Sequence, residues 1–283
     1  MNQTDAPVVV PATPNGNSSD LLLERVAQTP DIALFGRQHG DTWVDVTARD
    51  YLEQVRALAK GFIAAGIEPG EKIGLMAKTR YEWTLIDFAA WFAGAILVPI
   101  YETSAPSQVH WNLSDAGAHA VIVESPEHFA KYDEVAADLP DVRLAWQIDR
   151  GDLDKLAASG AGVSDEELER RRTLANEDDI ATIIYTSGTT GKPKGCVLTH
   201  RNFVELCRNT QAAIPEVIRP GSSTVLFIPT AHIFARFIAV LSVYGGVKVG
   251  HQPDTTKLVP TLGSFSPTFL LAVPRVFEKV YNS

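Results

Sequence analysis

Apolar residues along the chain recur in two alternating patterns between residues 72 and 148. Short apolar runs without strict alternation are typical of buried parallel strands, whereas apolar residues spaced by three and four are typical of helices. The runs predict strands at 72–77, 96–100, 119–123 and 142–148, and the spaced segments predict helices at 82–93, 106–116 and 126–137. This alternation indicates an α/β fold, with parallel or mixed β-sheets flanked by helices.

Similar patterns precede and follow this region. Before it we expect a helix at 20–28, a hairpin of strands 32–35 and 42–46, and a helix from Thr47 to about residue 65. After it we expect strands at 180–185, 196–198, 224–228, 247–250 and 268–272, and helices at 201–214, 233–244, 255–262 and from 275. The chain is therefore predicted to be α/β throughout.

Two segments interrupt the rhythm. Residues 1–20 are rich in Pro, Asn and Ser, which predicts a disordered tail. Residues 151–179 are polar and include the charged run 165–172, so we expect an exposed connection with one short solvated helix. We therefore predict a partial domain over 21–283, made of two α/β subdomains with a boundary near residues 150–180.

Composition narrows the class of protein. A hydrophobic share of 45% and a net charge of −9 favour a globular protein and disfavour a nucleic acid partner. Two cysteines outside any CxxC pattern argue against disulfide or zinc frameworks, so we expect a cytoplasmic protein. The apolar stretch 88–101 is shorter than the roughly 20 residues that span a bilayer. Contact with the inner membrane face, if any, is expected to be peripheral.

The segment from Tyr185 to Gly195 reads YTSGTTGKPKG and follows an apolar predicted strand. Three glycines let the backbone approach a phosphate chain, four hydroxyls add hydrogen-bond donors, and two lysines add positive charge. A flexible linker would not be expected to follow a buried strand with this composition. The predicted phosphate contacts are Thr186, Ser187, Gly188, Thr189, Thr190, Gly191, Lys192 and Lys194.

Two other phosphate-binding motifs fail on spacing. The P-loop of kinases and GTPases needs four residues between its glycines and a helix after its lysine. Here two residues separate Gly188 from Gly191, Pro193 follows Lys192, and a strand is predicted next. The dinucleotide-binding pattern G-x-G-x-x-G is absent from the loop.

The loop resembles the phosphate loop of the adenylate-forming (AMP-binding) superfamily, which includes acyl-CoA synthetases, luciferases and peptide-synthetase adenylation domains. The likeness extends from about residue 21 to the end, and other segments that carry it are 80–83, 98–104, 202–203, 229–236 and 273–281. The last two, PTAHIFAR and VPRVFEKVY, resemble the long-chain fatty acyl-CoA synthetase branch. The implied fold is part of the large N-terminal domain of these enzymes.

This resemblance implies a two-step reaction. A fatty acid carboxylate attacks the α-phosphate of ATP to give an acyl-adenylate, and the thiol of CoA then displaces AMP. The loop would hold the outer phosphates, Thr186 would contribute to Mg²⁺ binding, and Lys194 would take part in catalysis. Because the first step joins two anions, neutralising charge is its main demand.

Two residues of the 229–236 segment are candidates for the acyl side. The resemblance implies that His232 lies beside the acyl carboxylate, and an imidazole can orient such a group. A packing role at a helix N-terminus is the alternative for His232. Arg236 lies one helical turn along the same face and is a second candidate for substrate binding.

The later motifs of the superfamily are not found in this sequence. There is no Tyr-Gly-x-Thr-Glu segment, whose Glu completes the Mg²⁺ site, and no C-terminal domain with its adenylation lysine. We therefore expect a truncated product that is inactive alone. Two alternatives stay open: a fatty acyl-AMP ligase that loads a carrier protein, and a non-catalytic polyphosphate-binding or interaction fragment. Acyl chain length and oligomeric state also stay open.

Overall fold

The structure, a computed structural model, describes residues 10–11, 16–40, 42–186 and 192–272. Its larger sheet has six strands in the order β6-β5-β3-β4-β7-β8, parallel except for the antiparallel pair β7–β8. These strands are β3 (Lys72–Met76), β4 (Ile96–Ile100), β5 (Ala118–Val123), β6 (Leu144–Gln147), β7 (Ile180–Thr186) and β8 (Lys194–Thr199). The predicted parallel units and mixed sheets are confirmed.

The smaller sheet pairs two strands from the N-terminal part of the chain with two from the C-terminal part, in the order β2-β1-β10-β9. Its strands are β1 (Ala33–His39), β2 (Thr42–Thr47), β9 (Ser223–Leu226) and β10 (Lys248–His251). The predicted subdomain boundary near residues 150–180 does not separate the two sheets, because β7 and β8 follow it and belong to the larger one. The pairing of β1 with β10 is a long-range contact that the local pattern does not contain.

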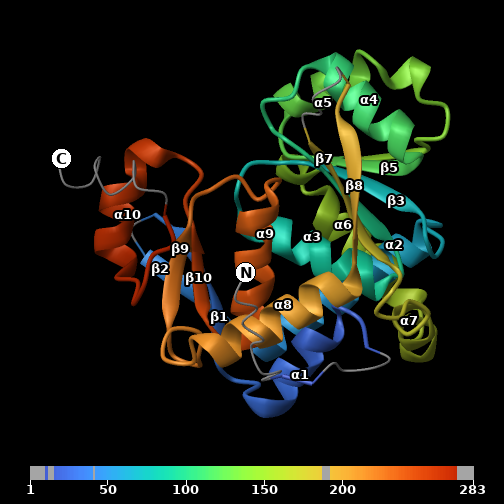
Figure 1. Cartoon of the computed structure of the whole chain (residues 1–283). Helices are drawn as coiled ribbons and strands as arrows, with labels where there is room; N and C mark the ends of the chain where they lie inside the picture. The colour runs from blue at the N-terminus through green and yellow to red at the C-terminus, as the bar shows by residue number, and fades with distance from the viewer. Residues whose placement is uncertain (1–9, 12–15, 41, 187–191, 273–283) are drawn as a thin grey trace, which may run out of the picture.

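Helices cover and separate the sheets (Figure 1). They are α1 (Asp20–Gln28), α2 (Ala48–Ala64), α3 (Tyr81–Phe92), α4 (Pro106–Ala116), α5 (Pro126–Asp133), α6 (Asp152–Ser159), α7 (Asp165–Arg172), α8 (His200–Ala213), α9 (Ile233–Gly245) and α10 (Leu258–Phe265). Short 3₁₀ turns lie at Ala136–Asp138, Ile148–Arg150, Gly160–Gly162 and Thr255–Lys257. Local chemistry explains the boundaries: Thr47 and Asp50 form a capping box on α2, and Gly117 ends α4 with a φ of 63°.

One continuous core links the two sheets. Its largest buried cluster includes residues of β1 and β10 in the smaller sheet and of β4 and β7 in the larger sheet. Helix α3 lies at its centre, with Trp83 and Trp91 buried. The sheets are therefore held together by shared packing around α3.

Among the described residues, no helix has both the length and the hydropathy of a bilayer-spanning segment.

The last residues of the predicted tail are packed into the fold. Asn17, Ser18 and Ser19 are buried, and the side chain of Asn17 donates hydrogen bonds to the carbonyl oxygens of Arg172 and Ala175. The predicted disorder is therefore wrong for these residues, because their polar groups are satisfied by α7 and the segment after it. Residues 1–9 and 12–15 lie outside the described residues.

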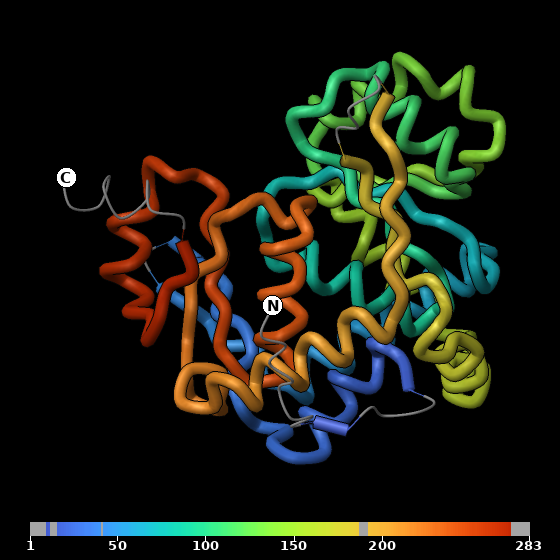
Figure 2. Tube along the Cα trace, in the orientation of Figure 1, coloured from blue at the N-terminus to red at the C-terminus, as the bar shows by residue number. Residues whose placement is uncertain are grey.

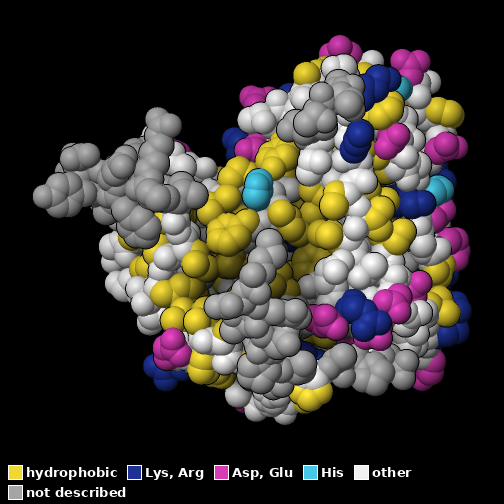
Figure 3. Space-filling view, in the orientation of Figure 1, with side chains coloured by type: hydrophobic (Ala, Val, Ile, Leu, Met, Phe, Trp, Pro, Cys, Tyr) yellow, Lys and Arg dark blue, Asp and Glu magenta, His cyan; other side chains and the backbone are white. Residues whose placement is uncertain are grey.

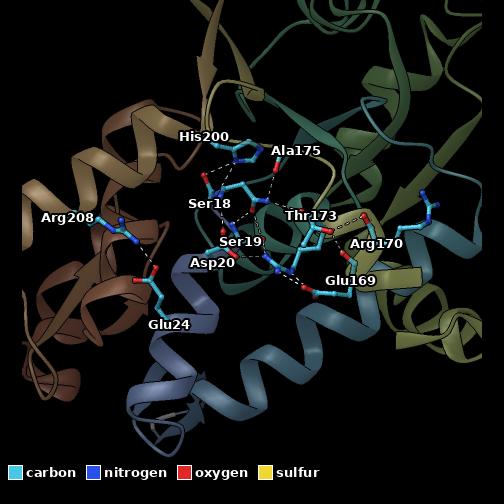
Figure 4. A network of polar contacts seen from close by, with 12 residues as sticks. Ser18, Ser19, Asp20, Glu24, Glu169, Arg170, Thr173, Ala175, His200 and Arg208 are labelled. Atoms are coloured by element: carbon cyan, nitrogen blue, oxygen red, sulfur yellow. Dashed lines mark hydrogen bonds and ion pairs between the residues drawn. The ribbon is translucent and has the colours of Figure 1, made fainter. Parts of the chain in front are cut away.

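The charged run 165–172 forms α7 and is not simply solvated, which corrects the prediction. Arg172 is buried, and its guanidinium donates to Ser19 Oγ at 2.9 Å, to Asp20 at 2.5 Å and to Glu169 at 2.6 Å. Figure 4 shows this network between α7, His200 and the start of α1. We call residues 17–20, Arg172 and His200 the N-terminal clasp.

Residues 268–272 do not form the predicted strand. The backbone N–H groups of Thr268 and Phe269 both donate to the carbonyl oxygen of Ser223 at the start of β9, and no ladder continues from there. Leu270 and Ala272 still pack on the apolar cluster of Val225 and its neighbours. Burial alone therefore accounts for the apolar pattern that predicted a strand here. The helix predicted from residue 275 lies outside the described residues.

Candidate functional site

A cavity of about 370 Å³ opens at the carboxyl ends of β4 and β7. Its lining residues are Tyr101, Ser104, Gln108, Asn112, Ile184, Tyr185, Thr186, Pro193, His232 and Ile233. They come from the end of β4, from α4, from both arms of the β7–β8 hairpin and from the start of α9. In sheets of this kind, ligands bind outside the carboxyl ends of parallel strands. Figure 3 shows hydrophobic side chains gathered over α9 and the neighbouring strands on this face.

The hairpin brings the two arms of the predicted phosphate loop together. Thr186 at the end of β7 pairs with Lys194 at the start of β8, and Tyr185 pairs with Gly195. A Cβ atom at Gly195 would lie 2.9 Å from Ile183 Cγ2, so glycine is required there for the strands to pack. Residues 187–191, which hold the predicted contacts Ser187, Gly188, Thr189, Thr190 and Gly191, lie outside the described residues.

Helix α4 contacts both arms. The Tyr185 hydroxyl donates to Asp115 Oδ2 at 2.7 Å, and burial, reinforced by Asp115, raises the pKa of Tyr185. The Trp111 indole Nε1–H donates to the carbonyl oxygen of Pro193 at 2.8 Å. The Lys192 ammonium lies 4.1 Å from the centre of the Trp111 ring. Phosphate contact by Lys192 stays a prediction, and here its charge is held on the indole face.

Lys194 differs from Lys192 in its surroundings. Its side chain is exposed at the start of β8, and within the described residues it takes part in no ion pair. Its charge is therefore available to an anion near the loop. Thr186, its cross-strand partner, lines the cavity and is also exposed.

His232 is the N-cap residue of α9 and lines the same cavity as Thr186. The backbone N–H of Phe234 donates to His232 Nδ1 at 3.2 Å. A neutral imidazole that accepts through Nδ1 carries its proton on Nε2, so the exposed ring has a donor to offer. The cavity therefore brings together Thr186 of the phosphate loop and His232 of the 229–236 segment. His232 also caps α9, which is the alternative role predicted for it from the sequence.

Arg236 is not part of the cavity, which corrects its assignment to substrate binding. Its side chain is 0% exposed and forms a bidentate ion pair with Asp87, with Nε donating to Oδ2 at 2.7 Å. It also donates to Thr182 Oγ1 in β7. Burial raises the pKa of Asp87, and Arg236 opposes that rise. The guanidinium has no free donor face for a ligand, because the core encloses it.

Sequence reasoning missed the contribution of α4 to the cavity. Gln108 and Asn112 are four residues apart, so they lie on one face of the helix. The Asn112 side chain is 6% exposed, and its Oδ1 atom has no hydrogen-bond partner in the described part of the chain. A buried acceptor without a partner is costly in a fold, so at the wall of a cavity Asn112 Oδ1 is available to a water molecule or a ligand. The polar i, i+4 pair was visible in the sequence, but its place beside β7 was not.

The donor set around the cavity does not by itself make a magnesium site. Mg²⁺ in proteins is usually held through one or two carboxylates with substrate phosphates and water. The side chains that line the cavity offer hydroxyls, carboxamides and an imidazole, but no carboxylate. Within the described ranges, no group of three or more His, Cys, Asp or Glu residues could hold a metal. Thr186 as a metal ligand stays a prediction.

Comparisons with known proteins agree with the fold. The family profile described as AMP-binding enzyme matches residues 22–283. A long-chain-fatty-acid–CoA ligase of Mycobacterium bovis is 38% identical over 286 residues, which cover 100% of this chain and 48% of the relative. A Xenopus laevis long-chain-fatty-acid–CoA ligase is 31% identical over 92% of this chain and 37% of its own length. The chain thus spans about half the length of the M. bovis relative.

Two solved structures have a fold similar to that of this chain. The inhibitor-bound N-terminal domain of FACL13 from Mycobacterium tuberculosis superimposes with a TM-score of 0.82 and 25% identity, over 95% of this chain and 65% of that one. A long-chain-fatty-acid-CoA ligase of Archaeoglobus fulgidus gives a TM-score of 0.83 at 19% identity, over 99% of this chain and 56% of that one. The second likeness bears on the fold alone.

Proposed function

Because the chain belongs to the AMP-binding enzyme family, we propose that it is the part of a long-chain-fatty-acid–CoA ligase that grips the phosphates of ATP and orients the acyl carboxylate. The observation that carries this proposal is the shared cavity, in which Thr186 and Pro193 of the loop arms face His232 of α9. A carboxylate and a phosphate chain could therefore meet at one place.

The residues would act by reducing repulsion between two anions. Lys194 brings a positive charge beside the loop, and the Thr186 hydroxyl donates a hydrogen bond to phosphate. His232 donates from Nε2–H to the fatty acid carboxylate, and the amino end of α9 adds a favourable dipole. The carboxylate then attacks the α-phosphate and pyrophosphate leaves. Contacts from residues 187–191 to the outer phosphates are part of the same proposal.

ATP and CoA enter this proposal as co-substrates, and Mg²⁺ as the counter-ion of the polyphosphate. The cavity lacks the carboxylate that a magnesium site would need, so no step is assigned to the metal through these residues. The relatives are named as CoA ligases, which favours CoA over a carrier protein as acyl acceptor. A cytoplasmic location, with peripheral contact at the inner membrane face, is the accompanying proposal.

Equilibrium binding by this chain tests the phosphate-gripping role. We expect inorganic pyrophosphate, titrated calorimetrically with magnesium chloride present, to bind the chain. Lys194→Met is expected to weaken binding by about tenfold or more, since a hydrogen bond to a charged group contributes roughly 1.5–3 kcal/mol. His39→Ala, in the smaller sheet, serves as control and is expected to leave the affinity unchanged. Equal affinities in all three proteins would remove Lys194 from the mechanism.

Turnover tests whether the chain is sufficient. With ATP, palmitate and hydroxylamine, we expect no acyl-hydroxamate above background, because the chain spans about half the length of its M. bovis relative. Clear turnover would contradict this and would show that the catalytic groups lie within residues 1–283. Binding of pyrophosphate without binding of fatty acid would favour the non-catalytic alternative.

A further inference from the structure

One face of α4 touches both arms of the β7–β8 hairpin. Trp111 and Asp115 are four residues apart and therefore lie on the same side of the helix. Asp115 accepts the hydroxyl of Tyr185 on the outgoing arm, and Trp111 bonds Pro193 on the return arm. The two arms are thus fixed to α4 as well as to each other.

Trp111 makes two separate contacts with the return arm. Its indole N–H meets the Pro193 carbonyl at 2.8 Å, a bond that fixes the backbone just before β8. Its ring face carries the Lys192 ammonium at 4.1 Å, well within the range of a cation–π contact. Because Lys192 and Pro193 are consecutive, one side chain constrains both the direction of the backbone and the position of the charge.

We propose that Trp111 is a positioning residue, which holds the return arm so that Lys194 presents its charge to the phosphate chain while Lys192 stays on the indole. This inference rests on the proposed function, because it assigns a role within the phosphate-gripping loop. Lys192 and Lys194 then have different tasks: Lys192 anchors the arm through Trp111, and Lys194 contacts the anion. From the sequence alone, both lysines are predicted phosphate contacts, and Lys192 is not assigned an anchoring role.

A double-mutant cycle on pyrophosphate affinity separates the positioning role of Trp111 from direct contact between Lys192 and phosphate. We expect Trp111→Leu to weaken binding by about tenfold, from loss of the hydrogen bond and the cation–π contact together. Trp111→Phe keeps an aromatic face for Lys192 and should lose only about threefold. Lys192→Met should also lose about threefold in the wild-type background, but nothing further in the Trp111→Leu background, because the anchor is already gone.

A matched control uses another indole. Trp43 in β2 of the smaller sheet also donates from Nε1, to Ser264 Oγ at 3.2 Å, and packs edge-on against Phe265 of α10. Trp43→Leu should leave pyrophosphate affinity unchanged. Thermal unfolding of each variant, measured in parallel, shows whether a weakened variant is still folded at the titration temperature.

The outcomes are distinguishable. No pyrophosphate binding by the wild-type chain overturns the proposed function and the positioning role with it. Wild-type binding that persists unchanged in Trp111→Leu overturns the positioning role alone. An equal loss from Lys192→Met in both backgrounds means that Lys192 contacts phosphate directly, which also overturns it.

Discussion

The two ends of the β7–β8 hairpin differ in how their polar groups are satisfied. At the lower end in Figure 2, where the tube passes into α8, the backbone N–H of His200 donates to the Asp179 carbonyl and Arg201 pairs with Glu177 and Asp178. His200 Nδ1 accepts from the Ser18 backbone N–H at 3.1 Å. These polar groups are partnered by other parts of the same chain.

The upper end also has bonded groups, Tyr185 and Trp111, but it keeps other polar groups without a partner among the described residues, and we call it the open end. Asn112 Oδ1 has no partner there within the described residues, Lys194 is exposed, and His232 presents a free ring edge to the cavity. Groups that the protein satisfies stabilise the fold, whereas preorganised groups left without partners are available to a ligand. The lower end, where the polar groups are partnered, is the closed end. Substitutions at the closed end should therefore change the free energy of unfolding, and substitutions at the open end should change ligand binding.

The largest effect is expected from the buried pair that fixes β7 between these ends. Asp87→Ala leaves the Arg236 guanidinium buried without its counter-charge and should lower the free energy of unfolding by about 3–5 kcal/mol. Urea unfolding followed by circular dichroism measures the change. The apolar pair Asp87→Leu with Arg236→Met removes both charges and should recover part of the loss. A loss below about 1 kcal/mol for Asp87→Ala would show that solvent reaches the pair.

This pair also shows where sequence reasoning fails. The backbone N–H of Arg236 donates to the carbonyl oxygen of His232, so the two residues are one helical turn apart, as their spacing predicts. Arg236, however, is completely buried, and its partner Asp87 lies 149 residues away in sequence. Arg172 and its partner Asp20 are 152 residues apart, so α7 looked solvated for the same reason. Hydrophobic periodicity predicts helices and strands, and a specific motif predicts the chemistry of a site. Neither shows which distant segments pack together, and that packing decides whether a charged side chain is buried.

The pH dependence of stability offers a second test of the closed end. Burial lowers the pKa of His200 from 6.5 to about 4. Between pH 6.5 and pH 4 the imidazole of His200 therefore binds a proton in the unfolded chain but not in the folded chain. The stability that depends on the neutral imidazole is present above pH 6.5 and is lost as the pH falls toward 4. His200→Gln should flatten the stability profile in that window by up to about 1.4 kcal/mol per pH unit. Parallel profiles for wild type and variant, compared by urea unfolding, would contradict the shift.

The N-terminal clasp should show a smaller loss with a clear internal control. Arg172→Ala removes bonds to Ser19, Asp20 and Glu169 and is expected to cost about 2 kcal/mol of unfolding free energy. Arg170, two residues earlier on α7, forms an ion pair only with Glu167 among the described residues, and Arg170 itself is exposed. Arg170→Ala should cost less than about 1 kcal/mol. Similar losses from the two variants, in the same unfolding experiment, would mean that the clasp is no more than a surface contact.

The smallest effect, and the one that separates the ends most sharply, is expected at Asn112. Its unpaired acceptor costs stability, so Asn112→Leu, similar in size, should leave the free energy of unfolding unchanged or raise it by about 1 kcal/mol. The same substitution fills the wall of the cavity with an apolar group and should weaken pyrophosphate binding. At the closed end every polar-to-apolar change is expected to lower the free energy of unfolding. A change of opposite sign at the two ends would therefore separate them. A clear loss of stability in Asn112→Leu would mean that the amide is satisfied within the fold, and the open end would then lose one of its distinguishing groups.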